Sequence, residues 1–296
     1  MRIVSLLPSA TEILFALGLG EQVVGVTFEC DHPPEARTRR IVSTSALPEG
    51  LAPAEIDAVV KERMAAGEDL YRLDRGAFAE LDPDLIVTQD LCAVCAVDVS
   101  EVDAALTHLG CDAEVLTLDP MRLDEVIASI TAVGEATGTW EQAEELVASL
   151  RACLRDLDRR LDGASRRPTL VLEWTDPAFS AGHWVPDMVA AAGGTEVLGQ
   201  AGKRSEGVGW DRVAGCGAEV VVVAPCGFGL EGAVDLAAAL FAAGHQPEGS
   251  EVWAVDADAY VVRPGPRVVD GCEMLATVLH PTRVGAPDPT KALRIT

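Results

Sequence analysis

Lysine and positive charge are scarce in this 296-residue chain. It contains three lysines, Lys61, Lys203 and Lys291, and its 23 basic side chains are outnumbered by 47 acidic ones, for a formal net charge of −24. Nucleic acids and anionic membrane surfaces are bound through clustered basic residues. The charge balance therefore argues against both kinds of partner, and the scarcity of lysine argues against a catalytic lysine.

Long apolar runs are also missing, since no segment approaches the roughly 20 apolar residues of a membrane-spanning helix. Pro8 and Glu12 interrupt the apolar amino terminus, and no small-residue cleavage site follows, so a signal peptide is not indicated. We expect instead a strand over 3–7 and a helix from Ser9, with Ser9 and Glu12 in a capping box. This predicts a cytoplasmic protein without a leader, with no membrane insertion and with reduced thiols.

The motifs of common hydrolases and nucleotide-binding proteins are absent as well. The sequence has no glycine-rich phosphate loop, no Ser/His/Asp order and no zinc-protease motif. Hydrolase function therefore has no support in the sequence, and whether the chain catalyses any reaction is left open.

What is present is an alternation of apolar strands and helices in two regions. Residues 1–120 and 164–296 each predict an α/β lobe, the second including a short strand over 260–262. Between them, residues 121–163 include an amphipathic helix from Thr139 to Leu161, about 35 Å long at 1.5 Å per residue. We therefore predict two Rossmann-like lobes joined by a long connector helix.

Four of the eight cysteines follow predicted buried strands. Cys30 follows VVGVTFE, Cys92 and Cys95 follow DLIVTQD, and Cys226 follows VVVVAP. Because open α/β sheets bind ligands beyond the carboxyl ends of their strands, these thiols are candidate ligands of a zinc ion or an iron–sulfur cluster. Cys92 and Cys95 have the spacing of a metal-binding or redox pair, although buried cysteines are often only small core residues.

Aromatic, histidine and arginine side chains fall in further strand-end loops. Tryptophan and phenylalanine suit stacking on a flat ligand, histidine suits a metal, and arginine suits a carboxylate or phosphate. Packing of the tryptophans in the core and capping of turns by the arginines are the alternatives. The candidates for contact with a bound cofactor are Trp174, His183, Trp184, Phe228, Arg263 and Arg267.

The segments IVSLLPSATEILFALGLG, LDPDLIV and RPGPRVVDGCEMLATVLHP resemble the class III substrate-binding proteins, in the branch of the cobalamin and siderophore receptors. The segments ECDHP, TQDLCAVCAV, EWTDPAFSAGHWVP and APCGF are most similar to a leaderless subgroup usually labelled cobalamin-binding protein. The resemblance covers nearly the whole chain. It implies two α/β lobes related to ABC transporter receptors and a ligand held between them.

Three functions follow as hypotheses. The first is a cytosolic binding protein for a metal chelate or tetrapyrrole such as cobalamin. The second is an enzyme or carrier that uses a metal or an iron–sulfur cluster on Cys30, Cys92, Cys95 and Cys226. The third is a module that binds a protein partner. Because no leader is expected, docking to a transporter is not favoured.

Overall fold

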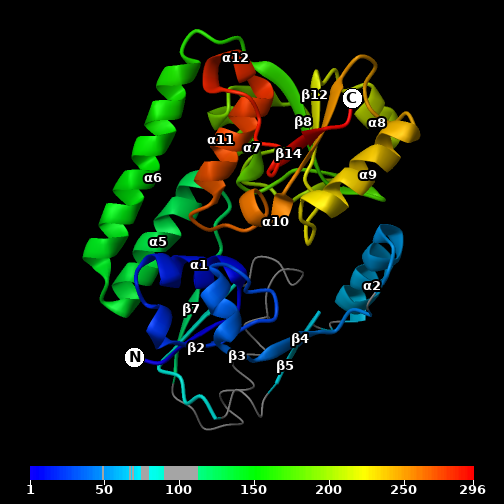
Figure 1. The fold of residues 1–296 in the computed structure, drawn as a ribbon. Helices are drawn as coiled ribbons and strands as arrows, with labels where there is room; N and C mark the ends of the chain where they lie inside the picture. The colour runs from blue at the N-terminus through cyan, green and yellow to red at the C-terminus, as the bar shows by residue number, and fades with distance from the viewer. Residues whose placement is uncertain (49, 67, 69, 75–79, 90–112) are drawn as a thin grey trace. The chain divides into compact units, whose positions relative to one another are not determined.

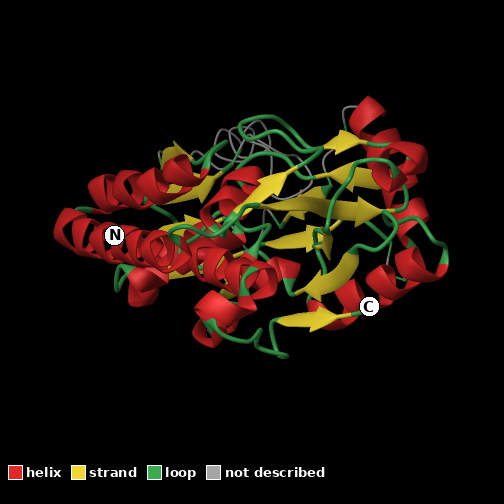
Figure 2. Cartoon of the chain, turned by 90° about the horizontal axis from the view of Figure 1, so that it is seen from above, coloured by secondary structure: helices red, strands yellow, loops and turns green. Residues whose placement is uncertain are grey.

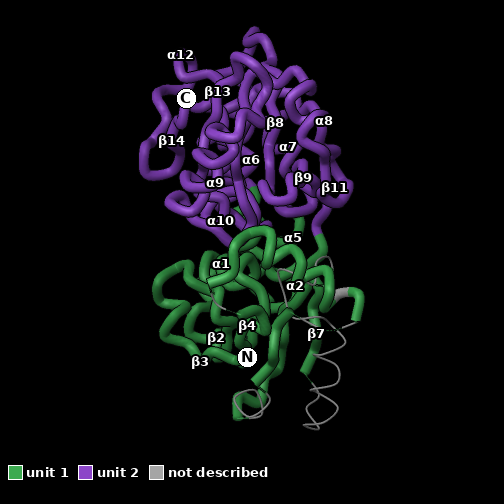
Figure 3. The backbone as a smooth tube through the Cα atoms, turned by 90° about the vertical axis from the view of Figure 1, so that its right-hand side faces the viewer, with its two compact units in different colours: residues 1–119, 128–147 green, residues 120–127, 148–296 purple. Residues whose placement is uncertain are grey.

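The computed structural model describes residues 1–48, 50–66, 68, 70–74, 80–89 and 113–296. The chain folds into two compact units, drawn in different colours in Figure 3. Unit 1 comprises Met1–Asp119 and Ala128–Val147, and unit 2 comprises Pro120–Ile127 and Ala148–Thr296. The described helices include none that is long and apolar enough to cross a membrane. The three-segment division predicted from the sequence stays a prediction.

Unit 1 is built on a parallel sheet with the strand order β3-β2-β1-β6-β7. Every residue of β1 and β6 is buried, as expected for apolar runs in a parallel sheet. The sheet contains β1 (Ile3–Ser5), β2 (Val23–Val26), β3 (Arg40–Ile41), β6 (Leu85–Thr88) and β7 (Glu114–Thr117). A separate antiparallel pair consists of β4 (Ser43–Ser45) and β5 (Tyr71–Leu73).

The helices of unit 1 include two α-helices and two short 3-10 turns. They are α1 (Pro8–Ala16), η1 (Gly20–Gln22), η2 (Pro34–Thr38) and α2 (Pro53–Ala66). The predicted capping box of α1 is wrong, because the helix begins at Pro8 and its N-cap, Leu7, makes no side-chain cap hydrogen bond. Proline at the first helical position has no N–H to satisfy, so the helix starts one residue earlier than predicted.

Two helices contribute residues to both units. They are α5 (Leu123–Thr137) and α6 (Trp140–Leu161). The 22 residues of α6 span about 33 Å. Glu141 lies in its first turn and Arg159 and Arg160 in its last, where each charge suits the helix dipole. The predicted connector helix is thereby confirmed, as are the two α/β lobes that it joins.

Unit 2 contains a larger, mixed sheet with the order β11-β9-β8-β12-β13-β14, and β10 pairs with β8 off this path. Strands β8, β12 and β13 are parallel neighbours at its centre, whereas β14 runs antiparallel at one margin (Figure 2). The strands are β8 (Arg167–Thr175), β9 (Ala178–Ser180), β10 (Gly194–Glu196), β11 (Glu206–Gly207), β12 (Val220–Val223), β13 (Glu251–Val255) and β14 (Ala292–Arg294).

Helices cover both faces of this sheet (Figure 1). On one face, Leu172 of β8 and Val221 of β12 pack in a core with Ala237 of α9. On the other, Gly194 of β10 lies against Val189 of α7 and Leu279 of α11. The helices of unit 2 are α7 (Val185–Ala191), α8 (Trp210–Ala214), α9 (Leu230–Ala242), α10 (Ala257–Tyr260), α11 (Val268–Leu279) and α12 (Pro281–Val284).

The strand predicted over residues 260–262 is wrong. The chain instead forms the helical turn α10 directly after β13, because Asp256 caps it by accepting the N–H of Ala259 at 3.1 Å. This turn holds Asp258 and Tyr260 beside the carboxyl end of β13.

Candidate ligand-binding site

The carboxyl ends of three neighbouring parallel strands in unit 2 bring together most of the candidate residues of that unit. Trp174 lies at the end of β8, Cys226 and Phe228 follow β12, and α10 follows β13. We call this margin the strand-end edge of unit 2. Because ligands of open α/β sheets bind at such a margin, it is the part of unit 2 that best suits a ligand.

An aromatic pair bridges the first two of these strands. The rings of Trp174 and Phe228 lie edge to face, with centroids 5.6 Å apart and an interplanar angle of 61°. The indole N–H of Trp174 donates to the carbonyl oxygen of Asp176 at 3.0 Å, which fixes the ring plane. Both rings are half-buried, so the pair offers an oriented apolar surface at the strand-end edge.

Asp258 ties the next two loops together. Its Oδ1 accepts the N–H of Gly227 at 3.1 Å, and its own N–H donates to the carbonyl oxygen of Phe228 at 3.3 Å. Arg263 lies 3.8 Å from Asp258 Oδ2 and is largely buried, with 14% of its side chain exposed. The loops after β12 and β13 therefore form one connected, charge-balanced structure.

Tyr260 carries two cations near its ring. The Lys291 ammonium lies 4.7 Å from the ring centroid and the Arg267 guanidinium carbon 6.0 Å from it. Sequence reasoning identified Arg267 but missed Lys291, because Lys291 precedes a strand. Since β14 runs antiparallel to β13, the residue before β14 lies at the same edge as the carboxyl end of β13. An expectation that β14 pairs antiparallel would have found it.

His183 has an unusual backbone and side chain. Its φ of 50° lies in the left-handed region, which non-glycine residues seldom adopt. Its N–H donates to the carbonyl of Lys203, and its carbonyl accepts the N–H of Gly202 at 2.9 Å. Nε2 is buried without a hydrogen-bond partner, and burial, with a smaller effect of Arg204, lowers the imidazole pKa. The lowered pKa favours the neutral imidazole, which is the form in which histidine binds metals.

Trp184 is an interior side chain. It is 6% exposed, its indole N–H donates to the carbonyl oxygen of Val261 at 2.8 Å, and its ring centroid lies 5.7 Å from that of His183. Its satisfied N–H and its burial are those of a core tryptophan. Its predicted contact with a ligand stays a prediction.

Two of the four candidate metal-binding cysteines, Cys30 and Cys226, are among the described residues, and their surroundings differ. Cys30 lies in unit 1, is 2% exposed, and its sulfur accepts the Thr11 hydroxyl at 3.0 Å and lies 3.2 Å from the Thr27 hydroxyl. Cys226 lies in unit 2, is half-buried, and its N–H donates to the carbonyl oxygen of Glu173 at 3.1 Å. Cys92 and Cys95 lie outside the described residues.

A metal centre on cysteines accordingly stays a prediction. Within the described ranges, no group of three or more His, Cys, Asp or Glu side chains is arranged to hold a metal ion. The cysteines of those ranges, Cys30, Cys153, Cys216, Cys226 and Cys272, include none in a disulfide.

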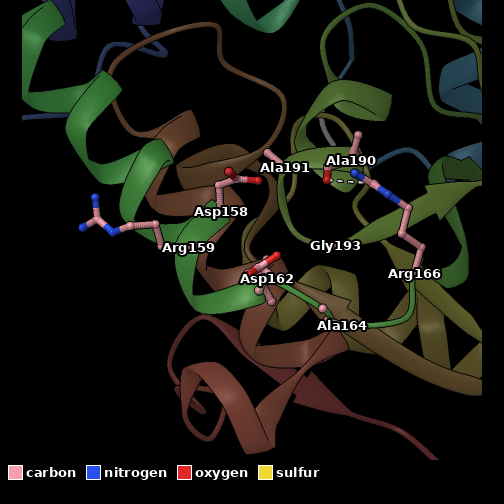
Figure 4. Close-up of a pocket in the computed structure, with 10 residues that line it drawn as sticks. Asp158, Arg159, Asp162, Ala164, Arg166, Ala190, Ala191 and Gly193 are labelled. Carbon is pink, nitrogen blue, oxygen red and sulfur yellow. Dashed lines mark hydrogen bonds between the residues drawn. The ribbon is translucent and has the colours of Figure 1, made fainter.

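A hollow of about 530 Å³ lies elsewhere in unit 2, between the carboxyl ends of α6 and α7 (Figure 4). Asp158 and Asp162 line it, and Arg166 spans one wall by donating to the carbonyl oxygens of Ala190 and Gly194 at 3.0 and 2.7 Å. Because Arg166 directly precedes the start of β8, this hollow lies at the margin opposite the strand-end edge. None of the predicted site residues that the structure describes lines it.

Known proteins resemble the chain over most of its length. The family model described as periplasmic binding protein matches residues 3–239. The vitamin B12-binding protein of Vibrio cholerae is 26% identical over 94% of this chain and 88% of its own length. An uncharacterized ABC transporter substrate-binding lipoprotein of Bacillus subtilis is 30% identical, but that match covers 56% of this chain and 43% of the lipoprotein.

Solved structures agree with the fold. The periplasmic vitamin B12 binding protein of Vibrio cholerae has a TM-score of 0.69 at 23% identity, covering 94% of this chain and 96% of that one. The periplasmic heme-binding protein of Roseiflexus sp. RS-1 has a TM-score of 0.69 at 27% identity, covering 95% and 98%. Two α/β lobes with a connecting helix define a substrate-binding protein of class III. The chain belongs to the periplasmic binding protein family.

Proposed function

We propose that this chain binds a metal chelate of the tetrapyrrole type, with cobalamin as the first ligand to test. The observation that carries the proposal is the Trp174–Phe228 pair at the ends of β8 and β12. An oriented aromatic pair beside charged side chains suits a flat ring that carries polar groups. Relatives that bind vitamin B12 and heme support the same ligand class.

Within this site, Trp174 and Phe228 provide the apolar contact and Arg267 lies within reach of anionic side groups. His183 is a candidate metal ligand, because its imidazole is neutral and its Nε2 has no hydrogen-bond partner. Since Nε2 is buried, coordination requires the structure around the imidazole to open. We therefore expect a slow spectral change after initial binding if His183 coordinates the metal.

The test is titration of the purified chain with cyanocobalamin, dicyanocobinamide and haem, followed by visible absorbance and thermal unfolding. Binding predicts a spectral shift and a raised melting temperature with at least one chelate. Replacing Trp174 with alanine should weaken that binding by about tenfold, the equivalent of about 1.4 kcal/mol. Trp174→Phe should retain most of the affinity, because it keeps an aromatic ring.

Trp140 offers a matched control, since it is 55% exposed and lies in unit 1. Trp140→Ala should leave binding unchanged. Absence of both a spectral shift and thermal stabilisation with all three chelates would reject the proposed function.

We also propose a cytoplasmic location, which the cysteine thiols of the described residues support. Cell fractionation with an antibody tests it, and recovery in the extracytoplasmic fraction would contradict it. Docking to a transporter, which the sequence did not favour, is supported by the similarity to an ABC transporter substrate-binding lipoprotein.

A further inference from the structure

Lys291 occupies a fixed position at the strand-end edge of unit 2. The N–H of Asp256, the residue after β13, donates to the carbonyl oxygen of Lys291 at 2.9 Å. The pairing of Ala292 with Val255 begins β14 one residue later. Lys291 is half-buried and is one of three lysines in a chain of net charge −24. A cation held here is therefore a local exception to the charge of the protein.

The Lys291 ammonium faces an aromatic ring and forms no salt bridge within the described part of the chain. It lies 4.7 Å from the centroid of Tyr260, which also has Arg267 at 6.0 Å. The Asp288 carboxylate attracts Lys291 electrostatically, but its Oδ1 already accepts the N–H and the hydroxyl of Thr290, at 2.9 and 2.7 Å. No carboxylate of the described residues is therefore seen in an ion pair with Lys291.

Packing of the Lys291 side chain against Tyr260 would explain the contact between the ammonium and the ring. It would not explain why positive charge gathers at this position. Arg267 is a second cation near the same ring, with its guanidinium carbon 6.0 Å from the centroid, so positive charge gathers around Tyr260. Arg263, at the same edge, lies 3.8 Å from Asp258, whereas the described part of the chain places no carboxylate in an ion pair with Lys291. Lys291 lies at the margin where ligands of α/β sheets bind, so a negatively charged group of the ligand is the natural partner for its ammonium.

We propose that Lys291 and Tyr260 hold an anionic group of the ligand, a carboxylate or a phosphate, and thereby favour chelates that carry such a group over neutral ones. The ammonium and the phenol each donate to an oxygen of that group, and charge-assisted hydrogen bonds of this kind are among the stronger ones. This proposal rests on the proposed function and names the chemistry that one end of the ligand must present.

Two pairs of chelates isolate the anionic group. Haem and its dimethyl ester differ only in the esterification of two carboxylates. Cobalamin and cobinamide differ in the nucleotide that cobalamin carries through a phosphodiester. Dissociation constants for all four are measured with the wild-type chain, Lys291→Gln, Tyr260→Phe and the control Arg212→Gln, which removes an exposed basic side chain of the same unit.

Lys291→Gln should weaken binding of the anionic member of one pair by about tenfold, as expected for a hydrogen bond to a charged group. Its neutral counterpart should change by less than about twofold, and Arg212→Gln should change neither. Tyr260→Phe, which keeps the ring, should weaken the same anionic member. An effect confined to the haem pair identifies a carboxylate, and one confined to the cobalamin pair identifies a phosphate.

Equal losses for both members of each pair, or no loss for any, would overturn the anion site. The anion site and the proposed function can be rejected separately. If the wild-type chain binds the chelates but Lys291→Gln does not discriminate between them, only the anion site is rejected. If the wild-type chain binds none of the four, the proposed function is rejected and the anion site with it.

Discussion

Glu196 gives the sharpest test of how the fold of unit 2 balances burial against hydrogen bonding. It ends β10, and its carboxylate receives four backbone N–H groups. Oε1 accepts from three consecutive residues of the following loop at 3.1 to 3.2 Å, and Oε2 accepts from Val171 of β8 at 3.0 Å. These donors favour the charged carboxylate, whereas burial favours the neutral acid. Burial is the larger effect and raises the pKa of Glu196 to about 7.

The sign of the pH dependence follows from this raised pKa. In the unfolded chain Glu196 has an ordinary pKa of 4.5, so between pH 4.5 and about pH 7 the folded chain binds more protons than the unfolded one. The contribution of Glu196 to stability is therefore complete below pH 4.5 and is lost as the pH rises to about 7. A shift of this size corresponds to roughly 3 kcal/mol at 1.36 kcal/mol per pH unit.

The perturbation is Glu196→Gln, which keeps the shape of the side chain and removes its titration. The assay is urea unfolding at fixed pH values from 4.5 to 8, followed by tryptophan fluorescence. This signal reports mainly on unit 2, because four of the five tryptophans lie there. They are Trp174, Trp184, Trp210 and Trp253.

The difference in unfolding free energy, wild type minus Glu196→Gln, should fall by roughly 3 kcal/mol as the pH rises across that range. A constant offset of about 1–3 kcal/mol is also expected, since the amide NH₂ of glutamine would face the N–H of Val171. Glu206→Gln, at an exposed glutamate of the same unit, serves as the control and should give a flat difference. A flat difference for Glu196→Gln, or one that rises with pH, would show that the four N–H donors outweigh burial and would refute the reasoning.

Three further predictions concern binding and packing. Trp174→Ala should weaken chelate binding by about tenfold in the titrations described above, whereas an unchanged dissociation constant would remove the aromatic pair from the site. Gly271→Ala should lower the free energy of unfolding by several kcal/mol in urea denaturation, because an added Cβ would overlap the carbonyl oxygen of Tyr260; a loss below about 0.5 kcal/mol would contradict this. Asp187→Asn should cost about 1 kcal/mol, because Asp187 receives the Arg122 guanidinium through two hydrogen bonds of 2.7 and 2.8 Å and Arg122 is half-exposed. A double-mutant cycle with Arg122→Gln measures the interaction free energy between the two side chains, which should be zero if the ion pair does not contribute to stability.

The parts of the fold that the sequence predicted correctly depend on local pattern. Runs rich in valine and isoleucine gave the buried strands β1, β6 and β12, since a parallel strand covered on both faces must be apolar throughout. The connector helix α6 was predicted from its amphipathic pattern and its length. The predictions that were wrong lie where a single residue determines the local backbone conformation. Pro8 starts α1 one residue early, and Asp256 caps a helical turn where a strand was expected.

Some residues of the candidate site could be placed from the sequence pattern, and others only from the pairing of strands. Trp174, Cys226 and Phe228 could be placed at one edge because each follows a parallel strand. Lys291 could not, because it precedes β14, and only the pairing of β14 shows which edge its amino end reaches. The environment of the Glu196 carboxylate could not be predicted either, since it is made by backbone N–H groups that any sequence would supply. Patterns of side chains predict positions along a strand, but not the direction in which a marginal strand joins a sheet.

The structure describes the surroundings of two of the four predicted metal-binding cysteines, Cys30 and Cys226. The sequence placed the weight on four thiols, yet the sulfur of Cys30 is enclosed with the hydroxyls of Thr11 and Thr27, at 3.0 and 3.2 Å. A thiol in such a setting is held as a small polar core residue. At the strand-end edge of unit 2, by contrast, the half-buried Trp174 has a fixed ring plane and Lys291 forms no salt bridge within the described residues. Side chains that are already oriented, but whose interactions within the protein are incomplete, can bind a ligand at a small cost in conformational entropy. The aromatic and cationic groups, more than Cys30, are therefore where ligand selection in this chain should first be tested.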